Sequence, residues 1–207
     1  MDEAAKTKLA ELTLDIPAPR ISEIVLRTSS YDVLKTWYQA VLGVVPFFEH
    51  IPEGWQSRPQ TADNRLDPNI RLCFLRVHNA FPYSQVVALF DVAGLERSDQ
   101  ASGLHHMQFR HASLPVLFDR FERLRGAGIR PDTCFNHGPA TSFYYADPDG
   151  NLVELSASNF DSEAAFLGYF ATPAFQKNPA GIRIDPDDYL ARHRGGEAQA
   201  DLVRIPD

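Results

Sequence analysis

An internal repeat sets the architecture of this chain. Residues 23–43, EIVLRTSSYDVLKTWYQAVLG, align without a gap with residues 106–126, HMQFRHASLPVLFDRFERLRG, at an offset of 83. Identities are few, but Arg27, Ser30 and Gly43 meet the same residue type at the same point of a strand-then-helix pattern. Such a repeat predicts two copies of one supersecondary unit, neither of which buries its apolar face alone.

Each copy continues with strand patterns instead of a second helix. In the first copy, alternation over 21–28 predicts a strand, Ser29 or Ser30 is the candidate N-cap, and Gly43 ends an apolar helical stripe. In the second copy, the stripe over 117–124 ends at Gly126 and Gly128. The strands expected after the two helices are 44–48, 70–77 and 85–92, then 129–136, 141–145 and 151–156, the last two joined by the turn Asp147-Pro148-Asp149-Gly150.

The predicted fold class is α+β. Paired βαβββ modules form a curved mixed sheet around a shared cleft, with a C-terminal helical tail. The predicted divisions are an N-terminal extension (1–19), a paired-module domain (20–157, with modules 20–95 and 103–157) and the tail (158–207).

The tail is expected to form two helices and to bury its aromatic side chains. Asp161 is expected to cap a helix ending at Tyr169, and Asp185, with Pro186 at the first helical position, a helix ending at Arg194. The aromatic side chains of these segments need burial, against the body or against a second copy, so a homodimer is expected. Earlier in the chain, the proline-rich loop over 51–68 is expected to cover the cleft.

Composition narrows the range of partners. The chain has 20 Lys and Arg against 27 Asp and Glu, a net charge of -7, which argues against nucleic acid as a partner. Residues 1–20 lack both a signal-peptide core and an apolar spanning run, so we expect a soluble, cytoplasmic protein with no membrane partner. Cys73 and Cys134 stand in apolar strand patterns, which is typical of buried free thiols.

Three charged or titratable residues are expected to meet in the cleft. Glu23 and His106 are equivalent under the repeat and both start strands, so they should approach one another. When residues 86–90 are aligned with 152–156, Glu154 matches Ala88. The fourth equivalent position in the cleft therefore has no side chain that could bind a metal ion. One imidazole and two carboxylates can hold a divalent ion, most readily Fe(II), while manganese, magnesium, zinc and nickel stay open.

A plainer interpretation of these residues is also open. Each could be a solvated rim charge, or two of them a salt-bridged pair. Glu154 fits that interpretation least, because it lies between apolar residues where an unpaired carboxylate is costly.

The segment from residue 137 to 154 resembles a known signature. It is similar to that of the type I extradiol ring-cleavage dioxygenases, within the vicinal oxygen chelate superfamily of glyoxalases, bleomycin-resistance proteins and extradiol dioxygenases. The resemblance covers about residues 20–157, and the matching positions are His137, Phe143, Tyr144, Asp147, Pro148, Gly150 and Glu154. Phe135 departs from the signature, which expects a small, Asn or aliphatic residue two positions before the histidine.

The resemblance implies a role for each matched residue. Glu154 resembles the carboxylate metal ligand and His106 the histidine ligand of the second module. Tyr144 and His137 resemble the tyrosine and histidine that hydrogen-bond the bound diolate, where a phenol stabilises developing charge and an imidazole exchanges a proton. The ordinary alternatives are a strand aromatic for Tyr144 and a loop residue for His137.

Two departures bear on the chemistry. Glu23 stands where the ring-cleaving enzymes usually have a histidine ligand, and Gln85 stands near the place of their acid/base histidine. Gln cannot exchange a proton, whereas His78, seven residues upstream, can reach in only if its loop swings.

Three functions are therefore weighed. The first is a metal-dependent dioxygenase of the EC 1.13.11 type that chelates the vicinal oxygens of a small aromatic, catechol-like substrate. The second is a non-redox glyoxalase-, epimerase- or isomerase-like enzyme with Glu23 as ligand and base. The missing fourth ligand at Ala88 counts against a true glyoxalase I. The third is a metal-free protein that sequesters an aromatic compound, against which His106 and Glu154 count.

Overall fold

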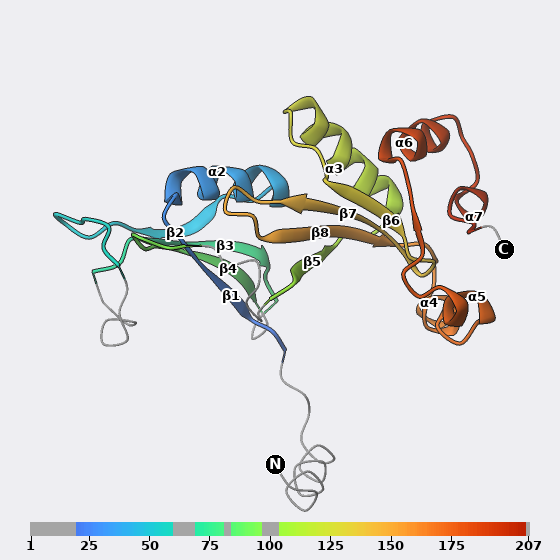
Figure 1. Ribbon diagram of the computed structural model, residues 1–207, viewed down its shortest axis with the longest axis horizontal. Helices are drawn as coiled ribbons and strands as arrows, with labels where there is room; N and C mark the ends of the chain where they lie inside the picture. Colours follow the sequence, from blue (N-terminus) through green and yellow to red (C-terminus); the bar gives the residue numbers. More distant parts are fainter. Residues whose placement is uncertain (1–19, 60–68, 81–83, 97–103, 206–207) are drawn as a thin grey trace, which may run out of the picture.

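A computed structural model describes residues 20–59, 69–80, 84–96 and 104–205 (Figure 1). The predicted N-terminal extension (1–19) and the second half of the 51–68 loop (60–68) fall outside these ranges. No helix in the described ranges is both long and apolar enough to cross a bilayer.

The two modules have the same order of elements. The first consists of β1 (Glu23–Thr28), α2 (Tyr31–Leu42), β2 (Pro46–His50), β3 (Leu72–His78) and β4 (Gln85–Asp91). The second consists of β5 (His106–Arg110), α3 (Leu114–Gly126), β6 (Thr133–Asn136), β7 (Ala140–Ala146) and β8 (Leu152–Ser158). The repeated βαβββ unit and the α+β class predicted from the sequence are confirmed.

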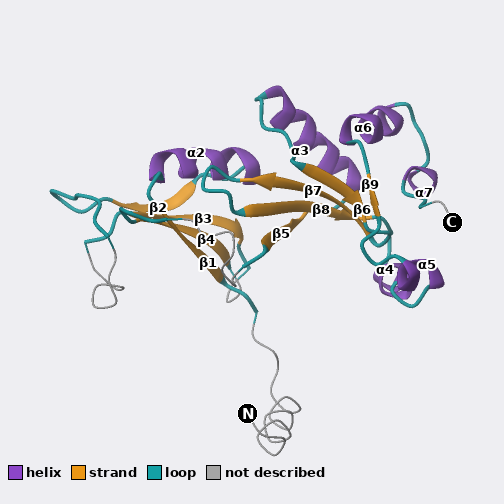
Figure 2. Cartoon of the chain, in the orientation of Figure 1, coloured by secondary structure: helices purple, strands orange, loops and turns teal. Residues whose placement is uncertain are grey.

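Hydrogen bonding divides the strands between two sheets (Figure 2). The orders are β1-β4-β3-β2 and β5-β8-β7-β6-β9, and in each module the first strand is parallel to the last. Since β1 and β5 are both edge strands, the curved sheet expected around the cleft consists of two sheets that do not share a strand pairing.

Local sequence explains the boundaries of the first helix. Gly43 adopts φ 68°, the left-handed conformation that ends α2. Ser30 is the N-cap as predicted, but its side chain makes no capping hydrogen bond. Instead, its backbone N–H donates to Thr28 Oγ1 at 2.9 Å.

Both α2 and α3 lie on the same side of the molecule, each against its own sheet (Figure 1). We call the face of each sheet opposite its helix the open face. On β1, Leu26 and Thr28 are buried under α2, whereas Glu23, Val25 and Arg27 point to the open face and are exposed.

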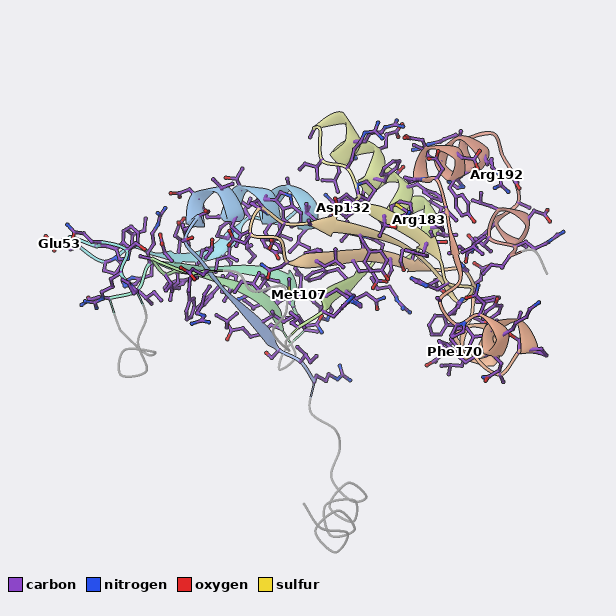
Figure 3. The ribbon with its side chains drawn as sticks, in the orientation of Figure 1. Glu53, Met107, Asp132, Phe170, Arg183 and Arg192 are labelled. Carbon is purple, nitrogen blue, oxygen red and sulfur yellow. The ribbon has the colours of Figure 1, made fainter. Side chains whose placement is uncertain are left out.

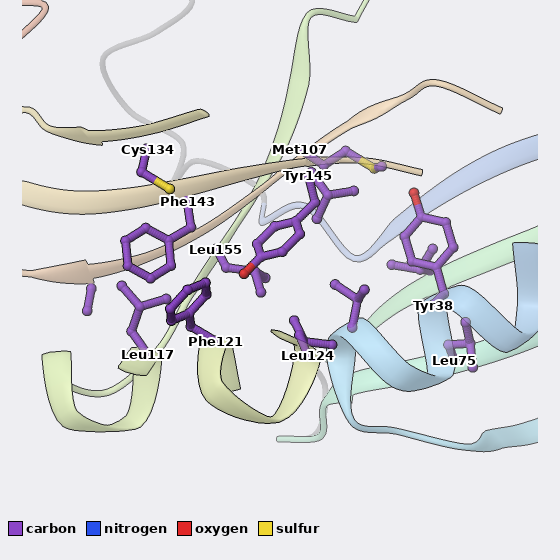
Figure 4. Close-up of a cluster of buried hydrophobic side chains, with 14 of the residues drawn as sticks. Tyr38, Leu75, Met107, Leu117, Phe121, Leu124, Cys134, Phe143, Tyr145 and Leu155 are labelled. Atoms are coloured by element: carbon purple, nitrogen blue, oxygen red, sulfur yellow. The ribbon is translucent and has the colours of Figure 1, made fainter. Parts of the chain in front are cut away.

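One hydrophobic core joins the modules on the helix side. Buried side chains of both modules form a single cluster, which includes Tyr38, Leu75, Met107, Phe121 and Leu155 (Figure 4). Within it, the buried hydroxyl of Tyr38 donates to Asp147 Oδ2 at 2.9 Å. The two modules therefore pack against each other through one shared core.

The tail packs on the second module. It consists of α4 (Glu163–Tyr169), α5 (Pro173–Lys177), β9 (Ile182–Arg183), α6 (Pro186–Arg194) and α7 (Gln199–Leu202). The helix predicted over 186–194 is confirmed with its cap, because Asp185 accepts from the backbone N–H of Asp187 at 2.9 Å. The predicted cap Asp161 is wrong: Ser162 caps α4, accepting from Ala165 N–H at 3.2 Å.

Three tail elements were not expected from the sequence, namely α5, β9 and α7. Each is five residues or shorter, so it carries too few residues for a periodic signal. Leu167 and Phe170 of the tail stay exposed, and Phe170 lies beyond the end of the second sheet (Figure 3). The two cysteines are buried free thiols as predicted, and burial raises the pKa of Cys134 to about 12.

Candidate metal centre and active site

Glu154 is the centre of a polar group on the open face of the second sheet. It lies in the middle of β8, only 2% exposed, with β5 and β7 on either side. Gln108 Nε2 and Ser142 Oγ both donate to its Oε1, each at 2.6 Å. These two bonds compensate the burial of the carboxylate and leave its second oxygen, Oε2, for another partner.

That partner is His106, at the start of β5. Its Nε2 lies 3.0 Å from Glu154 Oε2. A carboxylate only accepts, so this Nε2 carries a hydrogen, and in the neutral ring Nδ1 is an acceptor. His105 Nδ1 lies 2.7 Å from that Nδ1 and supplies the matching donor.

If His105 belonged to the same strand, alternation of side chains would predict that it faces away from His106. That expectation is wrong, because the strand begins only at His106 and the alternation of side chains does not extend to the residue before it. The contact between the two rings is edge-on, with centroids 5.0 Å apart.

Tyr144 and His137 form a second pair beside the carboxylate. Tyr144 on β7 is the register partner of Glu154, and its hydroxyl lies 3.0 Å from His137 Nε2. His137 Nδ1 lies 2.7 Å from the carbonyl oxygen of Ala180, which only accepts. His137 therefore carries a hydrogen on Nδ1, so Nε2 accepts from Tyr144 when the ring is neutral.

The protonation of Tyr144 follows from its surroundings. Burial, and then the negative charge of Glu154, hold the pKa of Tyr144 well above its usual range. The phenol is protonated at neutral pH and is available as a hydrogen-bond donor.

Phe135, the departure from the signature, lies against this pair. Its ring stacks on His137 with centroids 5.5 Å apart and an interplanar angle of 12°, and it meets Tyr144 edge-on at 6.3 Å. The larger side chain thus forms an aromatic wall that limits the positions of both rings.

The tail fixes the loop that carries His137. Gly138 has φ 93°, and a Cβ there would lie 2.2 Å from the ring of Tyr169. A Cβ on Gly181 would lie 2.1 Å from the backbone oxygen of Asn136. Because neither glycine has a Cβ, Gly138 can lie against Tyr169, and Gly181 can lie against the backbone of Asn136. These contacts bring Ala180 to His137, and the sequence gives no signal for them.

The structure brings four of the five predicted site residues together. His106, Glu154, Tyr144 and His137 are in contact, whereas Glu23 lies on the open face of the other sheet. Nowhere in the described ranges do three His, Cys, Asp or Glu side chains gather closely enough to hold a metal ion. Ala88, the counterpart of Glu154, is buried, and its methyl group cannot serve as a metal ligand.

A cavity of about 490 Å³ borders the site at the junction of the modules. Gln108, which donates to Glu154, lines it together with His78 and Gln85, which are register partners at the end of the first sheet. Its remaining polar wall includes Arg110 and Arg120. His78 therefore faces a space that adjoins the site.

The donor set fits a divalent cation in part. An imidazole nitrogen and a carboxylate oxygen face each other with a proton between them, and both belong to the ligand types of Fe(II), Mn and Zn. Oε1 of Glu154 is already fixed by two donors, an arrangement typical of metal ligands held by surrounding hydrogen bonds.

Paired βαβββ modules with an imidazole and a carboxylate facing each other on one sheet define the vicinal oxygen chelate class. The chain belongs to the Glyoxalase/Bleomycin resistance protein/Dioxygenase superfamily, whose family model matches residues 20–155. The resemblance stated from the sequence is confirmed.

Two relatives align with most of this chain over most of their own length. Biphenyl-2,3-diol 1,2-dioxygenase 2 of Rhodococcus globerulus is 32% identical, over 81% of this chain and 78% of the relative. Biphenyl-2,3-diol 1,2-dioxygenase 3 of the same organism is 29% identical, over 89% and 87%. A crystal structure of a glyoxylase/bleomycin resistance protein/dioxygenase domain from Frankia sp. EAN1pec, 17% identical, covers 69% of this chain and 99% of that one with a TM-score of 0.51, which shows the fold. Family and relatives together imply a divalent metal ion.

Proposed function

We propose that the chain is an extradiol ring-cleavage dioxygenase that acts on a small aromatic vicinal diol. The observation that supports this most is the connected set from His137 through Tyr144 and Glu154 to His106, which combines a metal-ligand pair with a protic pair. The two relatives named above are dioxygenases of a biphenyl diol, which favours the same reaction class here.

His106 Nε2 and Glu154 Oε2 are the proposed ligands within one copy. A divalent cation would take the place of the proton now between them, and the neutral His106 ring would then carry its hydrogen on Nδ1 instead of Nε2, with His105 Nδ1 as the acceptor. Glu23 is the proposed third ligand. Fe(II) is the proposed ion, with manganese, zinc and nickel as alternatives for reconstitution. When bound, the metal chelates the two oxygens of the diol and lowers their proton affinity.

The protein's own residues do the remaining work. Tyr144, kept protonated, donates a hydrogen bond to an oxygen of the diolate as negative charge develops there. The phenol has one hydrogen, so donating it to the diolate releases His137 Nε2, which can then receive a proton, while the Ala180 carbonyl holds the Nδ1 hydrogen in place. Phe135 provides an aromatic face beside both groups. Because Gln85 cannot exchange a proton, His137 is the proposed acid/base group.

A second candidate function is non-redox proton transfer on a metal-bound substrate. The observation that favours it is the exposed carboxylate of Glu23, the proposed third ligand, which can act as a base. The third candidate, metal-free sequestration, is an outcome of the same test. A cytoplasmic location stays a prediction from the sequence.

The test is anaerobic reconstitution of the full chain with Fe(II), Mn(II), Zn(II) or Ni(II), followed by metal analysis. Oxygen uptake is then measured with catechol, 3-methylcatechol and 2,3-dihydroxybiphenyl. We expect bound iron, dioxygen uptake equal to diol consumption, and formation of a yellow ring-opened product. Bound zinc, nickel or manganese as the best ion without oxygen uptake would favour the second candidate, and failure to retain any of the four would favour the third.

A further inference from the structure

We propose that the cavity at the junction of the modules binds a small organic carboxylate, which Arg110 and Arg120 hold by its charged end. Of the polar group around Glu154, only Gln108 and Glu154 itself are joined to this cavity, because Gln108 lines it and donates to the carboxylate. The carboxylate site needs no metal ion, so it is separate from the proposed metal centre. Its charge, its unpartnered hydrogen-bonding groups and its apolar walls support it.

The cavity carries positive charge that no carboxylate of the described residues offsets. Arg110, at the end of β5, and Arg120, on α3, both line it, and none of the described residues in its wall is acidic. This is unusual in a chain with 27 Asp and Glu against 20 Lys and Arg. Arginine guanidinium groups pair best with carboxylates and phosphates, so the charge of the wall favours an anionic ligand.

Contacts with neighbouring elements hold both guanidinium groups in place. Arg120 Nη1 lies 3.5 Å from the carbonyl oxygen of Ala40, and the guanidinium packs against Gly43, where a Cβ would clash with it. The Arg110 guanidinium lies over the ring of Phe166 on α4, 4.9 Å from its centroid. A guanidinium has five N–H donors, and a ring face or one distant carbonyl uses few of them. Both side chains are therefore positioned and still have donors for a ligand.

His111, directly after β5, adds a buried nitrogen without a partner. Its side chain lines the cavity, and its Nε2 is buried with no hydrogen bond to any described residue. Burial, and then the positive charge of Arg120, lower the pKa of His111 below its usual 6.5, so the ring is neutral at pH 7. In the tautomer with its hydrogen on Nε2, the ring can donate to a carboxylate. A bound anion would thus satisfy a group that is otherwise unpaired.

The remaining walls determine what kind of anion fits. Gln85 and His78, at the end of the first sheet, add hydrogen-bonding groups opposite the arginines' module. The volume of about 490 Å³ suits a small organic molecule. An inorganic anion would leave the apolar walls uncovered, whereas a carboxylate with a hydrocarbon or aromatic body covers them. These walls come from both modules and consist of Val41, Leu42, Val44, Val77, Phe109 and Leu155.

The proposed reaction is one source of such a carboxylate, and this part of the inference rests on the proposed function. Extradiol cleavage breaks the bond between a hydroxylated ring carbon and its neighbour and adds both atoms of dioxygen. The product has one carboxylate and one carbonyl group, and one proton is released. Because Gln108 belongs both to the active site and to the cavity, the product would be formed next to the two arginines. The other source is a small carboxylate unrelated to the reaction.

Titration calorimetry on the metal-free full chain tests the carboxylate site. The probes are benzoate, its neutral analogue benzyl alcohol, and inorganic phosphate. We expect benzoate to bind once per chain and the other two to bind at least about 10-fold more weakly, since one lacks the charge and the other the apolar body. Absence of benzoate binding would overturn the proposal, and so would benzyl alcohol or phosphate binding as tightly as benzoate.

Arginine variants locate the bound benzoate. Arg120→Gln and Arg110→Gln should each raise its dissociation constant about 10-fold, because each removes charge-assisted hydrogen bonds. Arg110 is exposed at the mouth of the cavity, so Arg110→Gln keeps the test valid if Arg120→Gln fails to fold.

The matched control is Arg123→Gln. Arg123 lies on the same helix as Arg120, is exposed and does not line the cavity. Its loss removes the same charge and should change the dissociation constant less than about 2-fold, because solvent and salt screen it. Wild-type affinity in both cavity variants, or an equal loss in Arg123→Gln, would overturn the proposal.

Competition distinguishes the two sources of the carboxylate. The ring-opened product of catechol, prepared separately, should displace benzoate from the metal-free chain with one-to-one stoichiometry. Failure to displace it would overturn the assignment to the product and leave an unrelated carboxylate as the ligand. The calorimetry uses no metal ion, so benzoate binding without oxygen uptake by the iron-loaded chain would support the carboxylate site while contradicting the proposed ring cleavage.

Discussion

The two modules share a backbone plan and differ on one face. On the helix side both are apolar, with Leu26 and Leu89 in the first module and Phe109 and Leu155 in the second. On the open face, the register pair of Phe74 with Ala88 in the first module stands where Tyr144 pairs with Glu154 in the second. The duplicated unit has kept its core pattern and concentrated the chemistry in one copy.

This difference also shows what keeps the site in order. In the second module the carboxylate is held by its neighbours on both sides, whereas the first module has no buried carboxylate at the equivalent position to be held. Burial of Glu154 is therefore tolerated because the same sheet supplies its donors. Five substitutions test what the two modules share and where they differ.

The largest effect is expected for Glu154→Ala. The chain should fold, lose its metal ion and lose turnover by more than about 100-fold, since this removes a ligand and the acceptor for three side chains. Metal analysis and oxygen uptake measure both. Glu53→Ala, an exposed carboxylate of the 51–59 segment, is the control and should change neither. Full metal occupancy in Glu154→Ala would remove Glu154 from the ligand set.

Tyr144→Phe should separate chemistry from binding. Metal content should be unchanged, while turnover falls about 100-fold because a single donor to developing charge is lost. Tyr145→Phe is a matched control, since Tyr145 is the next residue, faces the core and has a buried hydroxyl without a partner in the described chain. Equal losses of turnover in the two variants would mean that Tyr144 acts only through packing.

Ser142→Ala should weaken the hold on Glu154. One of the two bonds to Oε1 is lost, so the dissociation constant for the metal should rise about 10-fold. Ser156→Ala is matched to it, because Ser156 is the register partner on β8, equally buried, with no hydrogen-bond partner for its hydroxyl among the described residues. Competition with a coloured chelator measures the affinities, and an unchanged constant in Ser142→Ala would contradict the role given to that bond.

Tyr38→Phe tests the joint between the modules. It removes the bond to Asp147, which keeps its other donors from Asp149 and Asn151. Removing one buried bond to a carboxylate should lower the free energy of unfolding by about 1.5 kcal/mol. Urea denaturation should show one shifted transition. Two separate transitions would show instead that the modules unfold independently.

Asp187→Asn should have the smallest effect, with a defined pH dependence. Hydrogen bonds from Arg130 and then Arg125 lower the pKa of Asp187 from its usual 3.8, so the ion pairs join the tail to the second module only when the carboxyl is ionised. Their stabilisation is present above pH 3.8 and is lost as the pH falls through the lowered folded pKa.

At this exposed site the loss at neutral pH should stay below about 1 kcal/mol. Thermal melts of wild type and variant should therefore differ at pH 7 and converge as the pH falls below 3.8 through the lowered folded pKa. Asp32→Asn, which breaks the comparable pair with Arg71 inside the first module, should show the same trend. A difference for Asp187→Asn that stays unchanged while the pH is lowered until the carboxyl is protonated would contradict the electrostatic explanation.

Much of the fold could be predicted because its signals are periodic. Alternation and helical stripes located the repeated strands and helices, and Asp185-Pro186 located α6. In contrast, β9 has two residues, and its pairing with β6 depends on contacts distant in sequence. That pairing is what brings Ala180 to His137, so the orienting carbonyl could not be predicted.

For site residues on the same strand, the sequence predicts which face of the sheet they occupy. Ser142 stands two residues before Tyr144, and Gln108 two after His106, so alternation alone places each on the open face with its neighbour. Their bonds to Glu154 need the register between strands, which the sequence does not fix. The position of Glu23 relative to His106 depends on how whole modules pack, and a repeat predicts equivalence of positions but not their approach.

The proposal that His106 and Glu154 bind the metal ion is tested most directly by an anomalous difference map at the iron edge. The map is measured from crystals of the full chain loaded anaerobically with Fe(II). We expect one peak per copy, bonded to His106 Nε2 and Glu154 Oε2. A peak away from His106 and Glu154, or ordered crystals of iron-loaded protein without a peak there, would contradict it.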